Sequence, residues 1–534
     1  MRTRWTSTFA TSLLLAISAC AVDGEPEDLN PAPTGDVATE RAIAVAQTQL
    51  PGVLSLGAAD DVAPLSVVHD GRGQAHVRFQ QEHQGLPVFM GQAIAHVDIA
   101  TSKLATITDA RMAVSDVDVD PTVRIEDAIV TTSAVAGARD GVASADLMIY
   151  VAPDGTSHLV WHVELVRDDG DPVDRVALVD AHDGSVIFTY DNLQTGKGSK
   201  GRPGGGGGGG GGGSTAAVGI GHALYAGTVS VGTDYDGSST YTLRDLTRGA
   251  FYTIDMKGRQ SGGTVYTDSD NVWGDGSASS SATVAVDAHY GQAMTFDYYQ
   301  NVHGRSGIDG AGNAGYSRVH YGRRYNNAYW SDSCFCMTYG DGDGSVLSPL
   351  ASLDVAGHEM THGVTSRTAG LVYSGESGGL NEAMSDIFGT AVEFYANNPA
   401  EPGDWLIGAQ VYTPNKAGDA LRYMDHPTRD GASIDHYSNY SSGLDVHYSS
   451  GLANNAFYLL AQGGTNDTSG QSVTGIGRTK AEQIFYRALT VYMTPGTTFA
   501  GARAATLSAA ADLYGASSAE RNAVATAWSA CGVN

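Results

Sequence analysis

The chain has 534 residues, of which 58 are acidic and 31 are basic, and its formal net charge is -27. A chain of this length is expected to fold into roughly two to four domains. The acidic excess argues against nucleic acid and anionic membrane surfaces as partners, and it suits an exported protein whose carboxylates can bind Ca²⁺.

The N-terminus has the pattern of an export signal. Arg2 and Arg4 precede a short apolar run that ends at Ile17, and small residues lead into Cys20. This pattern predicts a signal peptide over residues 1–20. The letters ISAC resemble a bacterial lipoprotein processing site with Cys20 as the lipid-bearing residue. The alternative is ordinary cleavage nearby with an incidental cysteine, and no later apolar run in the sequence is long enough to span a bilayer.

A glycine tract divides the rest of the chain. Gly204–Gly213 is a run of ten glycines, which cannot form a packed element because glycine has no side chain to bury and much backbone entropy to lose. We therefore predict a flexible, protease-accessible linker over residues 200–214. In the preceding residues, 21–199, strand-like and helical patterns alternate as in an α+β region.

Two stretches before the linker resemble known propeptide modules. The letters QQEHQGLPVFMGQAIAHVD are similar to the fungalysin/thermolysin propeptide module. Residues 160–191 resemble the PepSY module, with two strand patterns around an Asp-Gly turn. These resemblances imply a pro-region that acts as an intramolecular chaperone and inhibitor.

The part after the linker changes character along its length. Residues 215–345 carry short strand-like runs rich in Gly, Tyr and Thr, and long helical patterns follow from residue 349 to Val533. We predict an α+β domain of two lobes with a cleft between them. The strand-rich lobe would cover residues 215–365 and the helical lobe residues 366–534.

The letters VAGHEMTHGV at the junction contain His358 and His362, four residues apart. On a helix this spacing puts both rings on one face, where one nitrogen of each can reach the same Zn²⁺. Glu359 lies one step round the helix, beside the metal, where it could act as general base towards a water molecule. The alternative is a helix that carries two ordinary histidines.

A catalytic zinc needs a third protein ligand and one open position. A second helix is predicted from near Leu380, with Glu382 and Asp386 on one face. We predict Glu382 as the third ligand and Asp386 as the acceptor of the other ring N–H of His358, which would fix its tautomer. Gly389 on the same face would let a neighbouring helix approach closely. The alternative is a solvated acidic face.

These motifs resemble those of the thermolysin family. HEMTHGVT and GLNEAMSDIFGTAVEFYAN match its H-E-x-x-H and N-E-x-x-S-D helices, and YNNAYW and YGDGDG are similar to its substrate-binding edge strand and the loop after it. The resemblance covers residues 215–534, and the form DVHYSSG is closer to the pseudolysin/vibriolysin branch. It implies a zinc metalloendopeptidase.

The resemblance also implies a role for each residue of the site. The implied catalytic residues are the zinc ligands His358, His362 and Glu382, the general base Glu359, the oxyanion donors His447 and Tyr373, and Asp445, which orients His447. The implied substrate-binding residues are Asn327 and Ala328 along the peptide backbone, Arg422 at a carbonyl on the primed side, and an apolar primed-side pocket of Leu347, Leu350, Val355, Ile407 and Leu421. Cleavage before Leu, Phe or similar residues is therefore expected.

Calcium is the second metal that the resemblance implies. Its main site would be formed by Asp354, Glu393, Asp404 and the carbonyl of Leu406, and we expect one ion because Leu406 and Ala409 stand where thermolysin carries glutamates. A second site is suggested by Tyr412, Thr413 and Asp419. A third, at Asp268 and Asp270, is as well explained by a solvated turn.

The later cysteines leave their pairing open. Cys334 and Cys336 are two residues apart, so a bridge between them would form a tight loop. Cys531 could remain free. A cysteine-ligated metal site is not expected, because no second closely spaced pair exists in the sequence to complete it.

Three hypotheses follow from the sequence. The first is a secreted, zinc-dependent neutral endopeptidase, made as a zymogen, inhibited by its own propeptide and monomeric when mature. Cleavage near the linker would free it from any lipid on Cys20. The second is a lipoprotein that acts as a non-catalytic binding module. The third is a different zinc hydrolase, such as an amidase or esterase.

Overall fold

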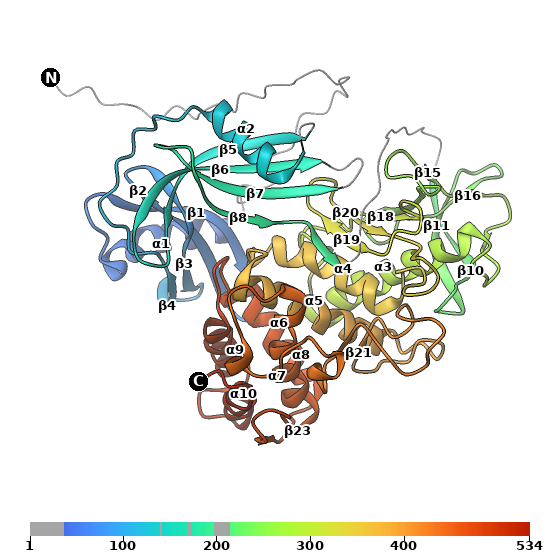
Figure 1. The fold of residues 1–534 in the computed structure, drawn as a ribbon. Coiled ribbons are helices and arrows are strands. Elements are labelled where there is room, and N and C mark those ends of the chain that lie inside the picture. The colour runs from blue at the N-terminus through green and yellow to red at the C-terminus, as the bar shows by residue number, and fades with distance from the viewer. Residues whose placement is uncertain (1–36, 139–140, 168–171, 197–213) are drawn as a thin grey trace.

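The computed structural model describes residues 37–138, 141–167, 172–196 and 214–534. The predicted signal peptide, Cys20 and the glycine tract lie outside the described residues. In Figure 1 the N-terminal part, blue to teal, lies beside the helical part, orange to red, and its strands extend towards the strand-rich part, green to yellow. Among the helices described, none combines the length and the apolar character that crossing a membrane requires.

The N-terminal part is a sheet with one helix on each of its two halves. The strands pair in the order β1-β2-β3-β5-β6-β7-β8, with β4 beside β3. Helix α1 buries Ala42, Ala46 and Leu50, spaced by four, against Val77 and other residues of the sheet. This spacing is that of an amphipathic helix, so the predicted α+β character is observed. The elements are α1 (Val37–Leu54), β1 (Asp60–His69), β2 (Gln74–His83), β3 (Leu86–Asp98), β4 (Lys103–Ala110), α2 (Ile125–Ala136), β5 (Val142–Val151), β6 (Ser157–Arg167), β7 (Val173–Asp180), β8 (Val186–Asp191) and β9 (Gln194–Gly196).

The strand-rich part contains two sheets packed around helix α3. One sheet has the order β16-β12-β11-β10-β17 and the other β13-β14-β18-β20-β19-β9, with β15 beside β14. The elements are β10 (Thr215–His222), β11 (Thr228–Tyr235), β12 (Tyr241–Thr242), β13 (Arg244–Asp245), β14 (Phe251–Asp255), β15 (Thr264–Val265), β16 (Thr267–Asp268), β17 (Val272–Trp273), α3 (Ser281–His303), β18 (Tyr316–Val319), β19 (Ala328–Ser331), β20 (Cys336–Tyr339) and α4 (Leu353–Ser366).

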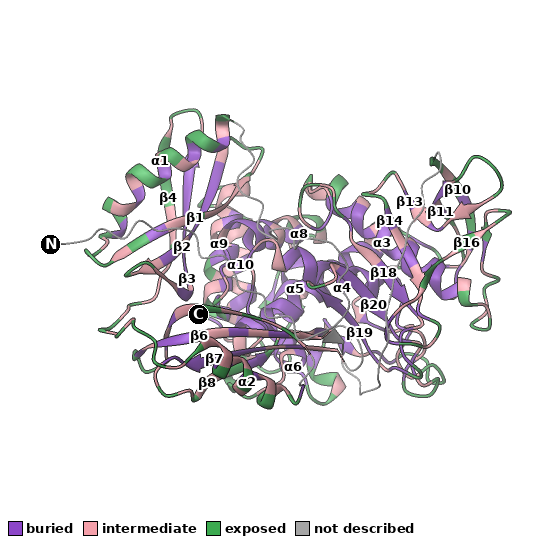
Figure 2. Ribbon diagram, turned by 90° about the horizontal axis from the view of Figure 1, so that it is seen from above, coloured by how far each residue is buried: buried purple, intermediate pink, exposed green. Residues whose placement is uncertain are grey.

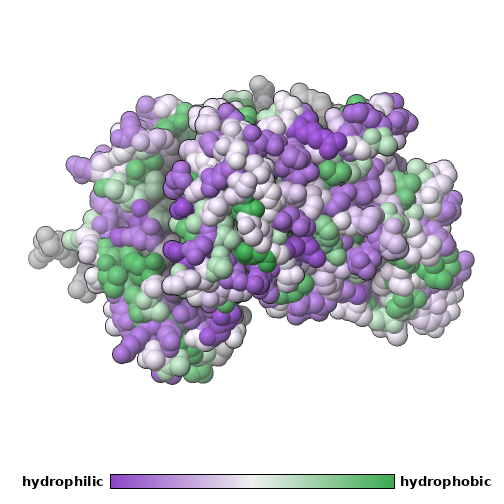
Figure 3. All heavy atoms as spheres, turned by 90° about the horizontal axis from the view of Figure 1, so that it is seen from below, coloured by the Kyte–Doolittle hydropathy of each residue, from purple (hydrophilic) through white to green (hydrophobic). Residues whose placement is uncertain are grey.

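The helical part packs around α5, as the long helical patterns predict. Its elements are α5 (Gly375–Ala396), β21 (Leu406–Ile407), β22 (Arg422–Tyr423), the 3₁₀ turns η1 (Pro427–Asp430) and η2 (Tyr437–Asn439), α6 (Val446–Ser449), α7 (Gly451–Gln462), β23 (Gly464–Thr465), β24 (Ser472–Val473), α8 (Arg478–Arg487), the π-helical η3 (Ala488–Tyr492), α9 (Phe499–Tyr514) and α10 (Ala519–Ala530). Figure 2 shows α4 and α5 buried at the centre of the molecule, whereas α1 and α2 carry exposed residues. On the face seen in Figure 3, hydrophilic residues predominate and apolar ones gather in separate groups.

Helix α5 begins earlier than the sequence predicts. It starts at Gly375 rather than near Leu380. The prediction placed the start too late because glycine usually disfavours helix interiors, whereas Gly378 and Gly379 lie inside this helix. A Cβ on Gly378 would lie 2.5 Å from a methyl carbon of Val446, so the helix needs glycine to pack against the segment that begins α6.

Helices α4 and α5 cross at two glycines. A Cβ on Gly357 would lie 2.9 Å from the Cα of Gly389, and a Cβ on Gly389 would lie 2.5 Å from the carbonyl oxygen of Asp354. Larger residues at either position would push the helices apart. The close approach that the sequence predicts at Gly389 is confirmed, and it brings side chains of the two helices into one site.

The N-terminal part touches both other parts. Strand β9 pairs antiparallel with the edge strand β19, with Gly196 opposite Ala328 and Gln194 opposite Trp330. A second contact joins the N-terminal sheet to the helical part, where Oδ2 of Asp70 lies 3.0 Å from Nη2 of Arg487. The residues before the linker therefore add a strand to the sheet of the residues after it.

Candidate active site

The two histidines of α4 point one nitrogen each at a common position. Nδ1 of His358 donates to Asp386 over 2.9 Å, and Nδ1 of His362 donates to the amide oxygen of Asn381 over 2.8 Å. These bonds leave both Nε2 atoms as acceptors, and they lie only 3.0 Å apart. Two lone pairs that face each other in a buried place need a metal cation or a proton between them.

Glu382 of α5 completes a group of three donors. Its Oε2 lies 3.6 Å from Nε2 of His358 and its Oε1 lies 3.4 Å from Nε2 of His362. The side chain is fully buried, and no described residue donates a hydrogen bond to Oε2. Tetrahedral ligands about 2.0–2.1 Å from a zinc ion are separated by about 3.3 Å. The donor set and its spacing therefore fit Zn²⁺ with one position left open.

Asp386 links the group of three donors to Arg422. Besides His358, the carboxylate accepts two bonds from Arg422, at 2.8 and 2.6 Å, and one from Asn454 at 2.8 Å. Burial by itself would raise the pKa of Asp386, but Arg422 and the bond from His358 hold it well below its ordinary value. The predicted contact with His358 is present. The guanidinium of Arg422, predicted at a substrate carbonyl, is committed mainly to Asp386.

Glu359 lies beside the donor group with an open carboxylate. It is 1% exposed, and its Oε2 has no hydrogen-bond partner among the residues described. Burial raises the pKa of Glu359 to about 8. Together with His358 and His362 it forms a group whose candidate metal-binding atoms all lie within 4.8 Å of one another. An acceptor of this kind beside a metal suits a general base.

His447 and Tyr373 both lie beside Oε1 of Glu382. Nδ1 of His447 donates to Asp445 over 2.7 Å, as predicted, so Nε2 faces the site. Tyr373 donates its hydroxyl to Oε1 of Glu382 and lies 3.4 Å from Nε2 of His447. Burial lowers the pKa of His447, but Glu382 and Asp445 raise it on balance, which favours a ring that can donate from Nε2.

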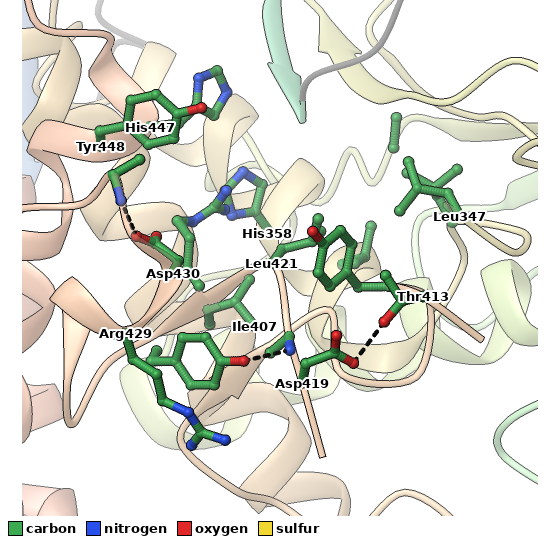
Figure 4. A pocket seen from close by; sticks show the side chains of 18 of the residues that line it. Leu347, His358, Ile407, Thr413, Asp419, Leu421, Arg429, Asp430, His447 and Tyr448 are labelled. Atoms are coloured by element: carbon green, nitrogen blue, oxygen red, sulfur yellow. Dashed lines mark hydrogen bonds between the residues drawn. The ribbon is translucent and has the colours of Figure 1, made fainter. Parts of the chain in front are cut away.

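A cavity of about 400 Å³ adjoins this group. Figure 4 shows its walls, with His358 and His447 on one side and Leu347 on the other, and the arrow of β9 above. The lining includes all five apolar residues that the sequence predicts for a pocket, namely Leu347, Leu350, Val355, Ile407 and Leu421. Ala328, Glu359 and Arg422 also line it, so the apolar pocket and the donor group share one space.

The edge strand offers groups to an extended peptide. Ala328 begins β19, and Asn327 directly before it is 3% exposed. The side-chain oxygen of Asn327 has no hydrogen-bond partner in the part of the chain that the structure describes. A buried acceptor without a donor is costly, so it is a place where a peptide N–H would bind.

Carboxylates gather at the start of α4, away from the histidines. Asp354 and Glu393 are each 1% exposed, and Asp404 lies beside them. Burial, together with the charges of Asp354 and Asp404, raises the pKa of Glu393 to about 10. The sequence analysis did not single out Glu401, which is also buried and accepts from the N–H of Leu353 over 3.0 Å. Such a group of like charges requires a cation or bound protons.

At the two other predicted calcium positions, the carboxylates already have hydrogen-bond or ion-pair partners within the protein. Asp419 accepts from Thr413 over 2.6 Å and from the ammonium of Lys416 over 2.7 Å, so a lysine already supplies a positive charge there. Asp268 accepts from the backbone N–H groups of Asp270 and Asn271, which is the geometry of a turn.

The structure gives the pairing of the three later cysteines. Cys334 and Cys336 form a disulfide at the tip of the β19–β20 hairpin, and Cys531 is a buried free thiol. Between the bridged cysteines, Phe335 packs edge-on against Trp330 at 5.1 Å and under Arg367 at 5.2 Å. The bridge therefore closes the hairpin at the end of the edge strand opposite to Ala328.

Several supporting residues were not predicted from the sequence. Asn381 and Asn454 orient His362 and Asp386, and Glu401 joins the carboxylate group. Asn381 directly precedes Glu382 in the chain, so its position beside a predicted ligand was the available signal. Asn454 comes from α7, and only the packing of that helix against α5 places it.

Comparisons with known proteins agree with this geometry. The profile described as "Thermolysin metallopeptidase, catalytic domain" matches residues 218–366, and "Thermolysin metallopeptidase, alpha-helical domain" matches residues 369–533. The profile "Fungalysin/Thermolysin Propeptide Motif" matches residues 60–100. The first two cover most of the chain after the predicted linker, and the third lies before it.

Curated relatives extend over most of the chain. The transglutaminase-activating metalloprotease of Streptomyces mobaraensis is 42% identical over 527 residues, which is 95% of this chain and 65% of that protein. A thermolysin of Alicyclobacillus acidocaldarius subsp. acidocaldarius is 41% identical over 87% of this chain and 84% of its own length. Thermostable neutral protease NprT of Geobacillus stearothermophilus is 40% identical over 90% of this chain and 88% of its own.

The chain thus spans just under two thirds of the first relative and more than four fifths of the other two. The matches include both lobes that carry the donor group and the propeptide motif before them. The chain therefore belongs to the thermolysin family of metallopeptidases, and it is a metalloprotease with a propeptide.

Proposed function

We propose that this protein is an exported, zinc-dependent neutral endopeptidase made as an inactive precursor. The observation that carries the proposal is the convergence of three buried donors, from His358, His362 and Glu382, beside Oε2 of Glu359, which accepts no hydrogen bond from any described residue. This group opens into an apolar cavity at the edge strand to which a peptide strand is already paired.

When bound, zinc would act as a Lewis acid on the scissile carbonyl and lower the pKa of a water molecule. Glu359 would take the proton from that water at its open Oε2 and later pass it to the leaving amine. His447 and Tyr373 would donate hydrogen bonds to the oxyanion as its charge develops. Asp445 would hold His447 in the tautomer that donates from Nε2.

Substrate would bind as an added strand along β19. Ala328 would offer its backbone and Asn327 its free side-chain oxygen, while Arg422, held by Asp386, would contact a carbonyl on the primed side. The residue after the scissile bond would enter the pocket of Leu347, Leu350, Val355, Ile407 and Leu421. Cleavage before leucine, phenylalanine and similar residues follows from the apolar lining.

Strand β9 would keep the precursor inactive. Because Gly196 pairs with Ala328, which lines the cavity, the end of the N-terminal part occupies the strand position that a substrate would need. Cleavage within residues 200–214 would separate the propeptide, 21–199, from the mature enzyme and from any lipid on Cys20. The two lobes, 215–365 and 366–534, would then act as a monomer.

Calcium would occupy one position. Asp354, Glu393, Asp404 and the carbonyl of Leu406 would hold one ion at the start of α4, and Glu401 lies close enough to influence the charge of Glu393. At the site of Tyr412, Thr413 and Asp419, the ammonium of Lys416 would take the place of the ion. Assignment to the pseudolysin/vibriolysin branch stays a prediction.

Self-processing tests the proposed function. The parent chain is expected to cut itself within residues 200–214. Glu359→Gln keeps the shape of the side chain but removes the base, so processing should slow by on the order of 10³-fold. The products would be followed by gel electrophoresis and N-terminal sequencing. Glu40→Gln, an exposed glutamate of α1, should process like the parent, and equal rates for Glu359→Gln and the parent would overturn the proposal.

The pocket gives a prediction about specificity. Leu421→Ala enlarges the apolar cavity, so kcat/KM for a peptide with phenylalanine after the scissile bond should rise relative to leucine, by about tenfold. The ratio would be measured with paired fluorogenic peptides. Val346→Ala changes an exposed residue beside Leu347 that does not line the cavity, and it should leave the ratio unchanged. An unchanged ratio in Leu421→Ala would place the specificity pocket elsewhere.

A further inference from the structure

A cup of aromatic side chains lies next to the edge strand, outside the cavity described above. Tyr321, Tyr325 and Tyr329 meet edge to face, with ring centroids 5.2 to 6.5 Å apart. Met256 packs with them, and all four side chains are buried at 5% exposure or less. Edge-to-face rings of this kind form a stable apolar wall.

One side chain in this cup comes from the other side of the predicted linker. Leu193, directly before β9, packs against the tyrosine cup together with Ile254. Strand β9 reaches the cup because Gln194 pairs with Trp330 of the edge strand. The side chain that fills the cup would leave with the propeptide, and the aromatic surface would then be open to another peptide on the same path.

The chemistry of the cup excludes positive charge. The guanidinium of Arg318 lies 5.5 Å from the ring centre of Tyr321 and 5.7 Å from that of Tyr329. It also donates to the hydroxyl of Tyr329 over 3.2 Å. The rings already interact with a buried cation, so a lysine or arginine of a substrate would meet like charge, whereas an apolar side chain would gain the full benefit of burial.

We propose that the tyrosine cup is a substrate subsite that selects an apolar side chain on the non-primed side, four residues before the scissile bond. The position follows from the register. Gly196 lies opposite Ala328 at the mouth of the cavity, so it marks the residue just before the bond to be cut, and Leu193 is three residues further back. This inference rests on the proposed function, because it assumes that substrates bind along β19 as β9 does.

The first test needs no variant. The processed enzyme, obtained by letting the full chain mature, is assayed with quenched fluorescent peptides of the form X-Gln-Thr-Gly-Leu-Ala, which carry the sequence of residues 193–196 before a leucine. With X as leucine, kcat/KM should exceed that with alanine by about tenfold, and lysine should be poorer than alanine. Mass spectrometry confirms that the cut lies between glycine and leucine.

A variant then locates the effect. Tyr325→Ala removes one wall of the cup, so the preference for leucine over alanine should fall to less than about twofold. Tyr235→Ala, which disturbs a tyrosine pair stacked at 4.7 Å on the other sheet, should keep the full preference. Equal cleavage of all three peptides by the parent enzyme would overturn the subsite while leaving the proposed function intact. Failure to cleave any of them in the presence of zinc would overturn both.

Discussion

Glu382→Ala is expected to lose zinc and peptide hydrolysis together. The substitution leaves two imidazoles, and a catalytic zinc requires three protein ligands. Glu382 is fully buried, with its carboxylate oxygens 3.6 Å from Nε2 of His358 and 3.4 Å from Nε2 of His362, so the substitution removes the third donor from the group. The loss of affinity should exceed the roughly 10- to 100-fold effect of removing an outer hydrogen-bond partner of a metal ligand.

Asn381→Ala provides the matched comparison on the same helix. It removes the acceptor that orients His362 but keeps all three donors, so zinc affinity should fall by about 10- to 100-fold and activity should return at high zinc. Zinc content would be measured by atomic spectroscopy after dialysis. A Glu382→Ala protein that keeps one zinc and full activity would show that another residue is the third ligand.

Removing calcium is expected to destabilise the mature enzyme strongly. Without a cation, the buried carboxyl groups of Asp354 and Glu393 and the half-buried one of Asp404 either repel one another or must bind protons, and leaving a buried charge unpaired costs about 3–5 kcal/mol. The melting temperature in a chelator should fall by on the order of 10 °C. Asp354→Asn should reduce the difference between calcium and chelator. Asp419→Asn should not, because Lys416 already balances that carboxylate.

The effect of the chelator should grow with pH. In the absence of a cation, burial raises the pKa of Glu393 from 4.5 to about 10 and that of Asp404 from 3.8 to about 6. A raised carboxyl pKa gives stability that is present at low pH and is lost as pH rises through the folded-state value. The calcium-free protein should therefore melt closer to the calcium form at pH 5 than at pH 8. A constant difference between the two forms would contradict a calcium site built from these residues.

The sequence predicted the parts of the site that depend on local geometry. His358, Glu359 and His362 are related by one helical turn, and Glu382 and Asp386 by another, so the spacing places them without knowledge of the fold. Gly389 lies on the same helix face as Glu382 and Asp386, so the sequence also predicted the close approach of a neighbouring helix there. The partners that meet across the fold were missed, as with Asn454 on α7 and Glu401 beside α4, because their contacts depend on how distant elements pack.

Tertiary contacts also changed the interpretation of some predicted residues. Arg422 was expected at a substrate carbonyl, but its guanidinium donates two hydrogen bonds to Asp386. Arg422 therefore helps to hold the carboxylate that orients His358, and it also lines the cavity. Asp419 was expected to bind calcium, and the structure pairs it with Lys416. The pairing of β9 with β19 was not predicted, since no local pattern specifies which edge strand a short segment will join.

The two alternative hypotheses differ from the main one in which features of the site they require. A binding module has no use for a buried carboxylate oxygen that finds no hydrogen-bond partner among the described residues, because such an oxygen is costly to maintain. An amidase or esterase would use the base but would not need a strand position on β19. The family matches favour the protease, and the occupied edge strand supports a peptide as the substrate.

The central claim is most directly tested by metal reconstitution of the processed enzyme and of Glu359→Gln matured by added parent enzyme. After removal of all metal, both proteins would be titrated with zinc while peptide hydrolysis and bound zinc are measured. The account predicts one zinc per chain in both, with hydrolysis returning in proportion to zinc only in the parent. Hydrolysis that persists without zinc, or that returns equally in Glu359→Gln, would contradict it.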